Sequence, residues 1–96
     1  MTRDIEAHRT VDAVWRIESA RIIAGLARLV QDVGLAEELA QDALVAALEQ
    51  WPAEGIPAKP GAWLMLTARH RAIDRIRREE RLAGKLALLK IGRAHV

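Results

Sequence analysis

One stretch of the sequence, Trp63 to Arg81, has the pattern of a single long helix that is apolar on one side and rich in arginine on the other. At about 100° per residue, the apolar face collects Met65, Ala68, Ala72, Ile73 and Ile76, with Leu66 at its edge. The opposite face collects Thr67, His70, Arg71, Asp74, Arg75, Arg77 and Arg78. We therefore expect the first face to pack in a core and the second to meet water or a charged partner.

Trp63 falls on the polar side of this predicted helix, close to Thr67, His70 and Asp74. One interpretation is that its ring stacks on a nucleic-acid base beside the arginines. The other is that it sits in the first turn and folds over the preceding loop, because buried tryptophans mostly belong to cores. The sequence leaves both interpretations open.

The composition favours an all-α fold. The chain of 96 residues has no Phe or Tyr, is rich in Ala, Leu, Arg and Glu, and confines its three prolines to residues 52–60. Helical periodicity predicts a first helix over about Val11–Val30 and a second over about Leu35–Trp51. A chain of this length forms one domain with a simple core. We expect a small bundle of three main helices, of which the last is basic.

The segments between the predicted helices also carry signals. Residues 1–10 show no period and are expected to fray. Gly34 is expected to adopt a positive φ just beyond the end of the first helix. Residues 52–61 are expected to form a rigid loop, since proline fixes φ and restricts the residue before it. Pro60 is well placed to begin the third helix.

Charge is segregated along the chain, although the net charge is only +2. Residues 1–60 contain six basic and ten acidic residues, whereas residues 61–96 contain nine basic and three acidic ones. No basic residue occurs between Arg28 and Lys59. This segregation predicts two different partners, or one partner with two poles.

The predicted second helix is apolar over more than half of its circumference, so we expect it to pack against two neighbours. Glu37 and Glu38 are expected in its first turn, where the helix dipole favours carboxylates. The rest is a narrow stripe that consists of Glu38, Gln41, Asp42, Val45 and Glu49. This acidic stripe is either a solvated face or a docking surface for a basic helical partner. Its lack of Lys and Arg and the apolar Val45 at its centre favour docking.

No catalytic constellation can be assembled from the sequence. His8, His70 and His95 have no partners at metal-ligand spacing, and there is no glycine-rich phosphate loop. Ser19, the one serine, has no nearby base, and the lack of Cys excludes disulfides and thiolate metal sites. We therefore expect a protein that is not an enzyme and uses neither a metal nor a cofactor.

Two further observations bear on location and partners. The apolar runs are too short to span a bilayer and Met1–Thr10 is polar, so a cytoplasmic protein without a membrane partner is expected. Six arginines and a histidine lie between Arg69 and Arg81. A helix of this kind can lie along a nucleic-acid backbone, which predicts a DNA or RNA partner.

The motif Ala36-Glu-Glu-Leu-Ala-Gln-Asp-Ala-Leu, a Pro-rich loop, and the motif Ala62-Trp-Leu-Met-Leu-Thr-Ala-Arg-His-Arg-Ala-Ile-Asp-Arg-Ile-Arg-Arg78 follow one another in the chain. In this order and at this separation they resemble region 2 of bacterial extracytoplasmic-function (ECF) sigma factors of the sigma-70 family. The resemblance implies a helical region 2 domain over residues 10–82. It also implies a role in transcription initiation, in which this domain binds core RNA polymerase and recognises and melts the −10 promoter element.

Site residues follow from the resemblance, position by position. It implies that Glu38, Gln41 and Asp42, with Val45 beside them, contact the clamp coiled coil of the polymerase β′ subunit. It implies that promoter DNA contacts a set of residues on the basic helix, namely Trp63, His70, Arg71, Asp74, Arg75, Arg77 and Arg78. The loop over residues 52–61 is expected to line a pocket for an extruded base. An anti-sigma factor is a further candidate partner.

The sequence departs from the family pattern at one of these positions. Family members commonly carry Asn where His70 stands, and His offers a base edge a different donor and acceptor geometry. ECF sigma factors also have a second, helix-turn-helix domain that reads the −35 element, and the sequence contains nothing that matches it. The base preference of this chain is therefore not predicted.

The pattern changes after Arg81. The helical signal weakens there: residues 82–89 are compatible with a prolonged helix that Gly84 interrupts. Lys90-Ile-Gly-Arg-Ala-His-Val96 has no period and equals what a common sequencing adapter encodes when translated. We therefore expect residues 83–96 to be the remnant of a linker followed by a non-native tail from about Lys90, on a truncated chain. A native disordered linker is the alternative, and resequencing of the intact locus distinguishes the two.

Two other functions remain open at this point. A stand-alone helical DNA-binding module would use the arginine face alone and leave the acidic stripe idle. A structural helical bundle whose charges only solvate it would bind neither DNA nor polymerase. Co-purification with core RNA polymerase separates both from the sigma-factor interpretation.

Overall fold

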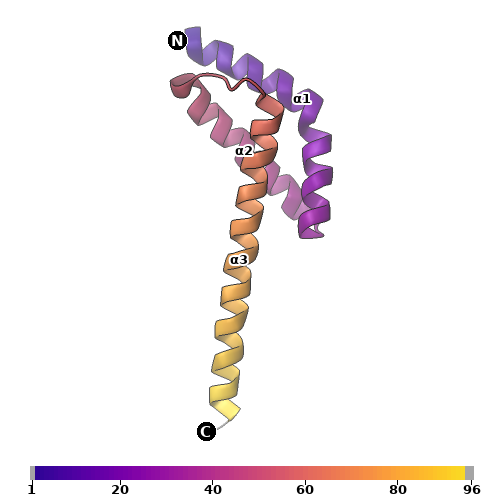
Figure 1. The fold of residues 1–96 in the computed structure, drawn as a ribbon, viewed down its shortest axis with the longest axis vertical. Helices are drawn as coiled ribbons and strands as arrows, with labels where there is room; N and C mark the ends of the chain where they lie inside the picture. The colour runs from indigo at the N-terminus through magenta and orange to yellow at the C-terminus, as the bar shows by residue number, and fades with distance from the viewer. Residues whose placement is uncertain (1, 95–96) are drawn as a thin grey trace.

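The computed structural model describes residues 2–94, and the side chains of residues 5–89. It contains three helices, α1 (Thr2–Val30), α2 (Val33–Glu54) and α3 (Pro60–Ala94), with no strand in the described part. Figure 1 shows α1 and α2 as a hairpin, with α3 crossing it and projecting far beyond it. The molecule is accordingly elongated, with extents of 65 × 25 × 18 Å. The expected all-α bundle of three main helices is confirmed.

The turn between α1 and α2 differs from the expectation for Gly34. Gln31, not Gly34, has the positive φ, 57°, and its backbone N–H donates to the Ala27 carbonyl at 2.8 Å. This is a left-handed cap that ends α1. Asp32 then caps α2, because its side chain accepts a hydrogen bond of 3.0 Å from the Leu35 N–H. As α2 begins at Val33, Gly34 lies inside its first turn.

Other boundaries also move. Glu37 and Glu38 fall in the second turn of α2, so the prediction that they occupy its first turn is wrong. Helix α2 continues through Pro52 to Glu54 and ends at Gly55, whose φ of 94° lies in the left-handed region. The loop is therefore shorter than the expected 52–61, since α3 begins at Pro60, as predicted.

Both ends of the chain are more helical than expected. Helix α1 begins at Thr2, because Ala7 and Val11 are buried among the core residues, so the prediction that residues 2–10 fray is wrong. Helix α3 continues past Arg81 to Ala94, and every residue from Arg77 to Leu89 is exposed. The side chains of the expected non-native tail from Lys90 lie outside the described ones, and that prediction stays untested.

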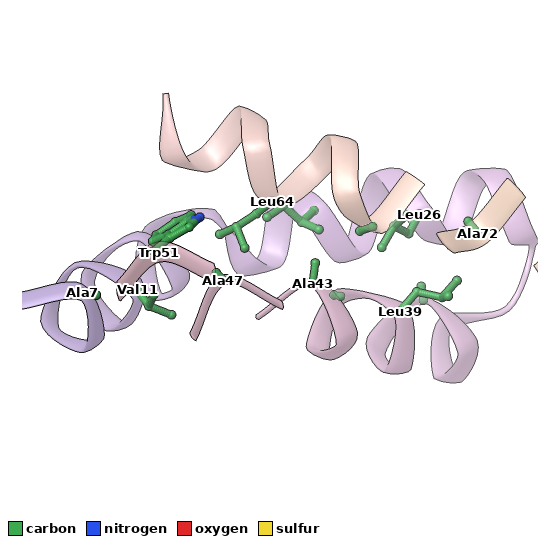
Figure 2. Packing of buried hydrophobic residues seen from close by; sticks show 13 residues of the cluster. Ala7, Val11, Leu26, Leu39, Ala43, Ala47, Trp51, Leu64 and Ala72 are labelled. Atoms are coloured by element: carbon green, nitrogen blue, oxygen red, sulfur yellow. The ribbon is translucent and has the colours of Figure 1, made fainter. Parts of the chain in front are cut away.

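The core runs between the three helices and is built largely from alanine and leucine. Figure 2 shows Ala7, Val11 and Trp51 at one end of it and Leu39 and Ala72 at the other. Alanines at the contacts let the helix backbones approach closely, which suits a small domain. Among the described side chains, no polar or charged residue is buried.

The buried face of α3 is rotated relative to the predicted one. Ala68 and Ala72 are fully buried, as expected, but the third buried residue is Leu64, which the predicted face omitted. Leu66, expected at the edge of the core, is 55% exposed. The reason is that α1 and α2 both pack on α3, and the line of contact passes through residues four apart, from Leu64 to Ala72.

A close contact positions the start of α3 on α1. Gly61 lies so near Glu18 that an added Cβ would be 3.0 Å from the Glu18 Cγ and Cδ atoms. No acidic residue of α3 itself lies in its first turn, so Glu18 places a carboxylate from α1 beside the positive end of the α3 dipole. This contact helps to define the direction in which the basic helix leaves the bundle.

None of the helices in the described residues has an apolar stretch long enough to cross a membrane.

Candidate functional site

The acidic stripe is an exposed face of α2. Its buried side consists of five alanines, Leu39 and Trp51, so the stripe residues point outwards. All five of them are exposed, namely Glu38, Gln41, Asp42, Val45 and Glu49. The prediction from periodicity that these residues share a solvent-facing stripe agrees with this burial pattern.

Val45 gives the stripe an apolar centre, because its side chain is 50% exposed between carboxylates. An exposed valine alone would need no explanation. Surrounded by acidic residues and with no basic residue on α2, it offers a partner helix an apolar contact inside an anionic rim. The stripe is therefore chemically suited to a basic amphipathic partner.

The basic face of α3 is also exposed. His70, Arg71, Asp74, Arg75, Arg77 and Arg78 are all exposed, as predicted. Arg75 Nε donates to Glu79 Oε1 at 3.2 Å along the same helix. The other ion pair in the described residues joins Arg21 to Glu18, on α1. Most of the positive charge on α3 is therefore available to an external anion.

This face spans the point where α3 leaves the bundle. Among the described side chains of α3, Ala72 is the last buried one, and Ile73 and Ile76 after it are partly buried. Arg71 therefore lies next to the buried part of α3, whereas Arg77 and Arg78 follow its last partly buried residue, Ile76. A hollow of about 380 Å³ on this part of α3 is lined by Asp74, Arg77, Arg78 and Arg81. The site residues named from the resemblance did not include Arg81.

A small hollow between α2 and α3 brings the stripe and the basic face together. It has a volume of about 140 Å³ and is lined by Leu39, Asp42, Arg71, Asp74, Arg75 and Arg78. The sequence contained no signal for this meeting, since 29 positions separate Asp42 from Arg71. The two predicted surfaces are therefore neighbours at Asp42.

Trp63 packs on the protein core. Its ring meets that of Trp51 edge to face, with centroids 5.3 Å apart and an interplanar angle of 71°, and it is partly buried. This geometry supports the interpretation that Trp63 folds onto the core beside the loop. Contact of its exposed part with DNA stays a prediction.

The end of α2 and the first loop residues after it do line a hollow, but not one beside the basic face. The hollow has a volume of about 430 Å³ and is lined by Pro52 to Ile56 with Glu6, Ala7 and Trp51. His70 and the arginines of α3 are not among its lining residues. The expected pocket for an extruded base therefore stays a prediction, and this hollow by itself carries two carboxylates, Glu6 and Glu54.

A groove between α1 and α3 contains residues that were not predicted as site residues. It has a volume of about 410 Å³ and is lined by Gly25, Arg28, Leu29, Met65 and Arg69. Only the packing of α1 on α3 brings Arg28 and Arg69 together. In the described residues, no group of three His, Asp or Glu side chains could hold a metal ion.

Sequence comparison relates the chain to a known protein family. The family model described as Sigma-70 region 2 matches residues 16–82. The chain is 41% identical over 59 residues to an uncharacterized protein of Rhizobium meliloti (strain 1021). This match covers 62% of this chain and 14% of that protein. It is 35% identical over 81 residues to the ECF RNA polymerase sigma factors SigK of Mycobacterium sp. (strain KMS) and Mycobacterium sp. (strain JLS).

The matches to the SigK proteins cover 77% of this chain and 40% of each relative. The chain therefore spans less than half the length of the curated relatives it matches. No solved structure matches its sequence significantly.

Proposed function

Because this chain belongs to the sigma-70 region 2 family, we propose that it acts in transcription initiation as the part of a sigma factor that contacts both polymerase and promoter. In this proposal α2 binds core RNA polymerase, at the clamp coiled coil of the β′ subunit. Helix α3 binds promoter DNA and helps to recognise and melt the −10 element. The similarity to proteins named ECF RNA polymerase sigma factor supports this role.

The observation that carries the proposal is that the bundle exposes two oppositely charged surfaces on two different helices, α2 and α3. The acidic stripe on α2 has an apolar centre and no basic residue, and the basic face on α3 has a single carboxylate, Asp74, among its residues. A protein that binds a cationic protein helix and an anionic nucleic acid at the same time requires this arrangement. A DNA-binding module alone does not require the stripe.

On the polymerase side, Glu38, Gln41 and Asp42 supply carboxylates and an amide to a basic helix, and Val45 supplies the apolar contact. Opposite charges across such an interface mainly increase the association rate and select the partner. The exposed position of these four side chains means that they bind without rearrangement of the core.

On the DNA side, the arginines of α3 contact phosphates, and His70 contacts a base edge. Phosphate contacts position the helix without reading sequence, whereas a donor or acceptor at a base edge discriminates between bases. Asp74 lies among the arginines and is suited to accept a hydrogen bond from a base amino group. An anti-sigma factor that covers either surface would prevent initiation.

The proposal is tested by assembly with core RNA polymerase. We expect the purified chain to co-purify with core enzyme and Asp42→Lys to weaken this association. Because the position is exposed, the same variant should change the free energy of unfolding by only about 0.5 kcal/mol. Glu54→Lys is the matched control, since it reverses a charge at an exposed position near the end of α2, outside the stripe.

Unchanged polymerase affinity for Asp42→Lys would refute the clamp assignment. If the chain binds DNA in a salt-dependent way but never binds polymerase, it is a DNA-binding module. If it binds neither, the charges only solvate the bundle.

A further inference from the structure

The part of α3 that follows its last partly buried residue carries an exposed apolar face. Every residue from Arg77 to Leu89 is exposed, and the exposed fractions of Leu82, Leu86 and Leu89 are 57%, 51% and 62%. These leucines lie on one side of the helix, and Lys85 lies beside them, because the four positions are i, i+4, i+7 and i+3. We call these four residues the leucine face. Single surface leucines need no partner, whereas neighbouring ones on one face are typical of a contact site.

Charge indicates which kind of surface fits the leucine face. Residues 77–89 contain four basic and two acidic residues, which gives a net charge of +2. Residues 33–54, which form α2, contain five acidic residues and no basic one, which gives −5. Two leucine faces brought together would repel, whereas the leucine face and α2 attract each other. A surface of complementary charge is therefore present in this chain itself.

The C-terminal half of α2 also offers apolar contacts. Val45 is 50% exposed, and Leu48 and Pro52 are partly exposed. Together with the exposed Glu49 they occupy positions i, i+3, i+4 and i+7, so they share one side of the helix. We call these four residues the α2 face. Like the leucine face, it consists of three apolar side chains and one charged side chain, and the two charges are opposite.

The order of these residues selects an antiparallel arrangement of the two helices. Laid antiparallel, the faces bring four pairs of residues opposite one another, namely Leu82 with Pro52, Lys85 with Glu49, Leu86 with Leu48, and Leu89 with Val45. Each pair is either apolar on both sides or a cation with a carboxylate. A parallel arrangement would place Lys85 on Leu48 and Leu86 on Glu49, which leaves the charges unmatched.

This contact requires two copies of the chain. The start of α3 lies beside the end of α2, because the rings of Trp63 and Trp51 meet there. Lys85 is 22 residues further along α3 than Trp63, which corresponds to about 33 Å. Figure 1 shows this part of α3 projecting away from α2. The leucine face therefore cannot reach the α2 face of its own chain.

We propose that the leucine face of one copy docks antiparallel on the α2 face of a second copy, and that a two-fold symmetric dimer makes this contact twice. The pairing does not rest on the proposed function, because both surfaces belong to this chain. It bears on that function at one residue: Val45 is covered in the dimer, so a paired copy cannot use it to bind polymerase.

Sedimentation equilibrium of the purified chain, without polymerase or DNA, tests the pairing. We expect the average mass to rise with concentration from 10.7 kDa towards twice that value. The dissociation constant should be about 1–100 μM, because a pair of short helix contacts lies at the small end of specific interfaces. The affinity should fall at high salt, since the contact depends partly on charge.

Two leucines of α3 form a matched pair of variants. Leu86 and Leu88 are 51% and 69% exposed, but only Leu86 belongs to the leucine face. Leu86→Ala should raise the dissociation constant of the dimer at least about tenfold, because it removes apolar area from both contacts. Leu88→Ala should leave it unchanged. Neither variant should unfold the bundle, since both positions are exposed and alanine favours the helix.

Charge reversal tests the pairing of Lys85 with Glu49. Lys85→Glu and Glu49→Lys should each weaken the dimer about five- to tenfold, as expected for an exposed charge pair that occurs twice. Combining both substitutions in one chain, or mixing the two single variants in equal amounts, should restore the dimer. Glu37→Lys is the control, because it reverses an exposed charge of α2 outside the α2 face.

A mass of one chain at every concentration would overturn the pairing. So would equal effects of Leu86→Ala and Leu88→Ala, or a mixture of the two charge variants that stays monomeric. If the chain forms a dimer that Glu49→Lys does not weaken, the leucine faces pair with each other and the α2 face is not used. Failure of the proposed function looks different, because it appears only when polymerase or DNA is added.

Discussion

Replacing Leu64 by Ala tests the orientation of α3, on which the position of every arginine of the basic face depends. Leu64 is 0% exposed and belongs to the core cluster, whereas Leu66, two residues later on the same helix, is 55% exposed. The two leucines therefore form a matched pair in which only burial differs. A helix rotated as the sequence pattern suggested would make Leu66 the more important of the two.

The magnitude follows from burial. Removing the buried part of Leu64 loses its transfer free energy and leaves a cavity, which together cost about 3–5 kcal/mol in a well-packed core. Leu66→Ala loses part of the transfer term and leaves no cavity, so it should cost well under about 1 kcal/mol. For a domain of this size, the loss expected for Leu64→Ala lowers the Tm by more than about 10 °C.

Urea unfolding followed by tryptophan fluorescence measures the free energy of unfolding of both variants. The signal reports on the bundle because the Trp51–Trp63 contact lies in the core that Leu64 helps to fill. Fluorescence is preferable to circular dichroism here, since the projecting part of α3 contributes helix signal that does not report on the bundle. Equal losses for the two variants, or a larger loss for Leu66→Ala, would refute the observed rotation of α3 and the placement of its basic face.

Two further predictions follow from the structure. Removing one phosphate-binding arginine, in Arg71→Ala or Arg78→Ala, should weaken DNA binding by the polymerase complex for all sequences alike and lower the slope of binding affinity against salt concentration by about one unit. Arg9→Ala, on the N-terminal part of α1, is the control. An unchanged slope for both α3 variants would mean that the face is only solvated. Gly55→Ala should lower the free energy of unfolding by about 1–2 kcal/mol, because φ is 94° at this position. Gly84→Ala, with open space around it, should instead increase the helix content measured by circular dichroism. Equal effects of the two substitutions would contradict the assigned conformation of Gly55.

The helical period of the sequence was sufficient to predict both charged faces. On α2, alanine and leucine recur so regularly that one narrow stripe is left over, and the structure exposes every residue of it. On α3, four arginines of the predicted polar face, Arg71, Arg75, Arg77 and Arg78, are exposed. These predictions hold because the projection of side chains around a helix depends on local geometry alone. The functional roles of these residues remain predictions.

Helix boundaries were less predictable, because they depend on a few hydrogen bonds with near-equal local alternatives. Gly34 was expected to end α1, but Gln31 adopts the left-handed conformation and Asp32 caps α2. Glycine is favoured at such positions and is not obligatory, and a capping carboxylate shifted the start of the next helix. The helical state of residues 2–10 likewise follows from burial of Ala7, which the local sequence does not indicate.

The sequence by itself determined the number of helices, their amphipathic faces and the separation of acidic and basic charge, since all three are properties of short segments. Only the tertiary structure decided that Leu64 is buried in place of Leu66, that Trp63 packs on Trp51, and that Asp42 shares a hollow with Arg71 and Arg78. Each of these depends on the rotation and crossing of helices far apart in the chain. That geometry is set by how the side chains of all three helices fit together, and no single segment contains it.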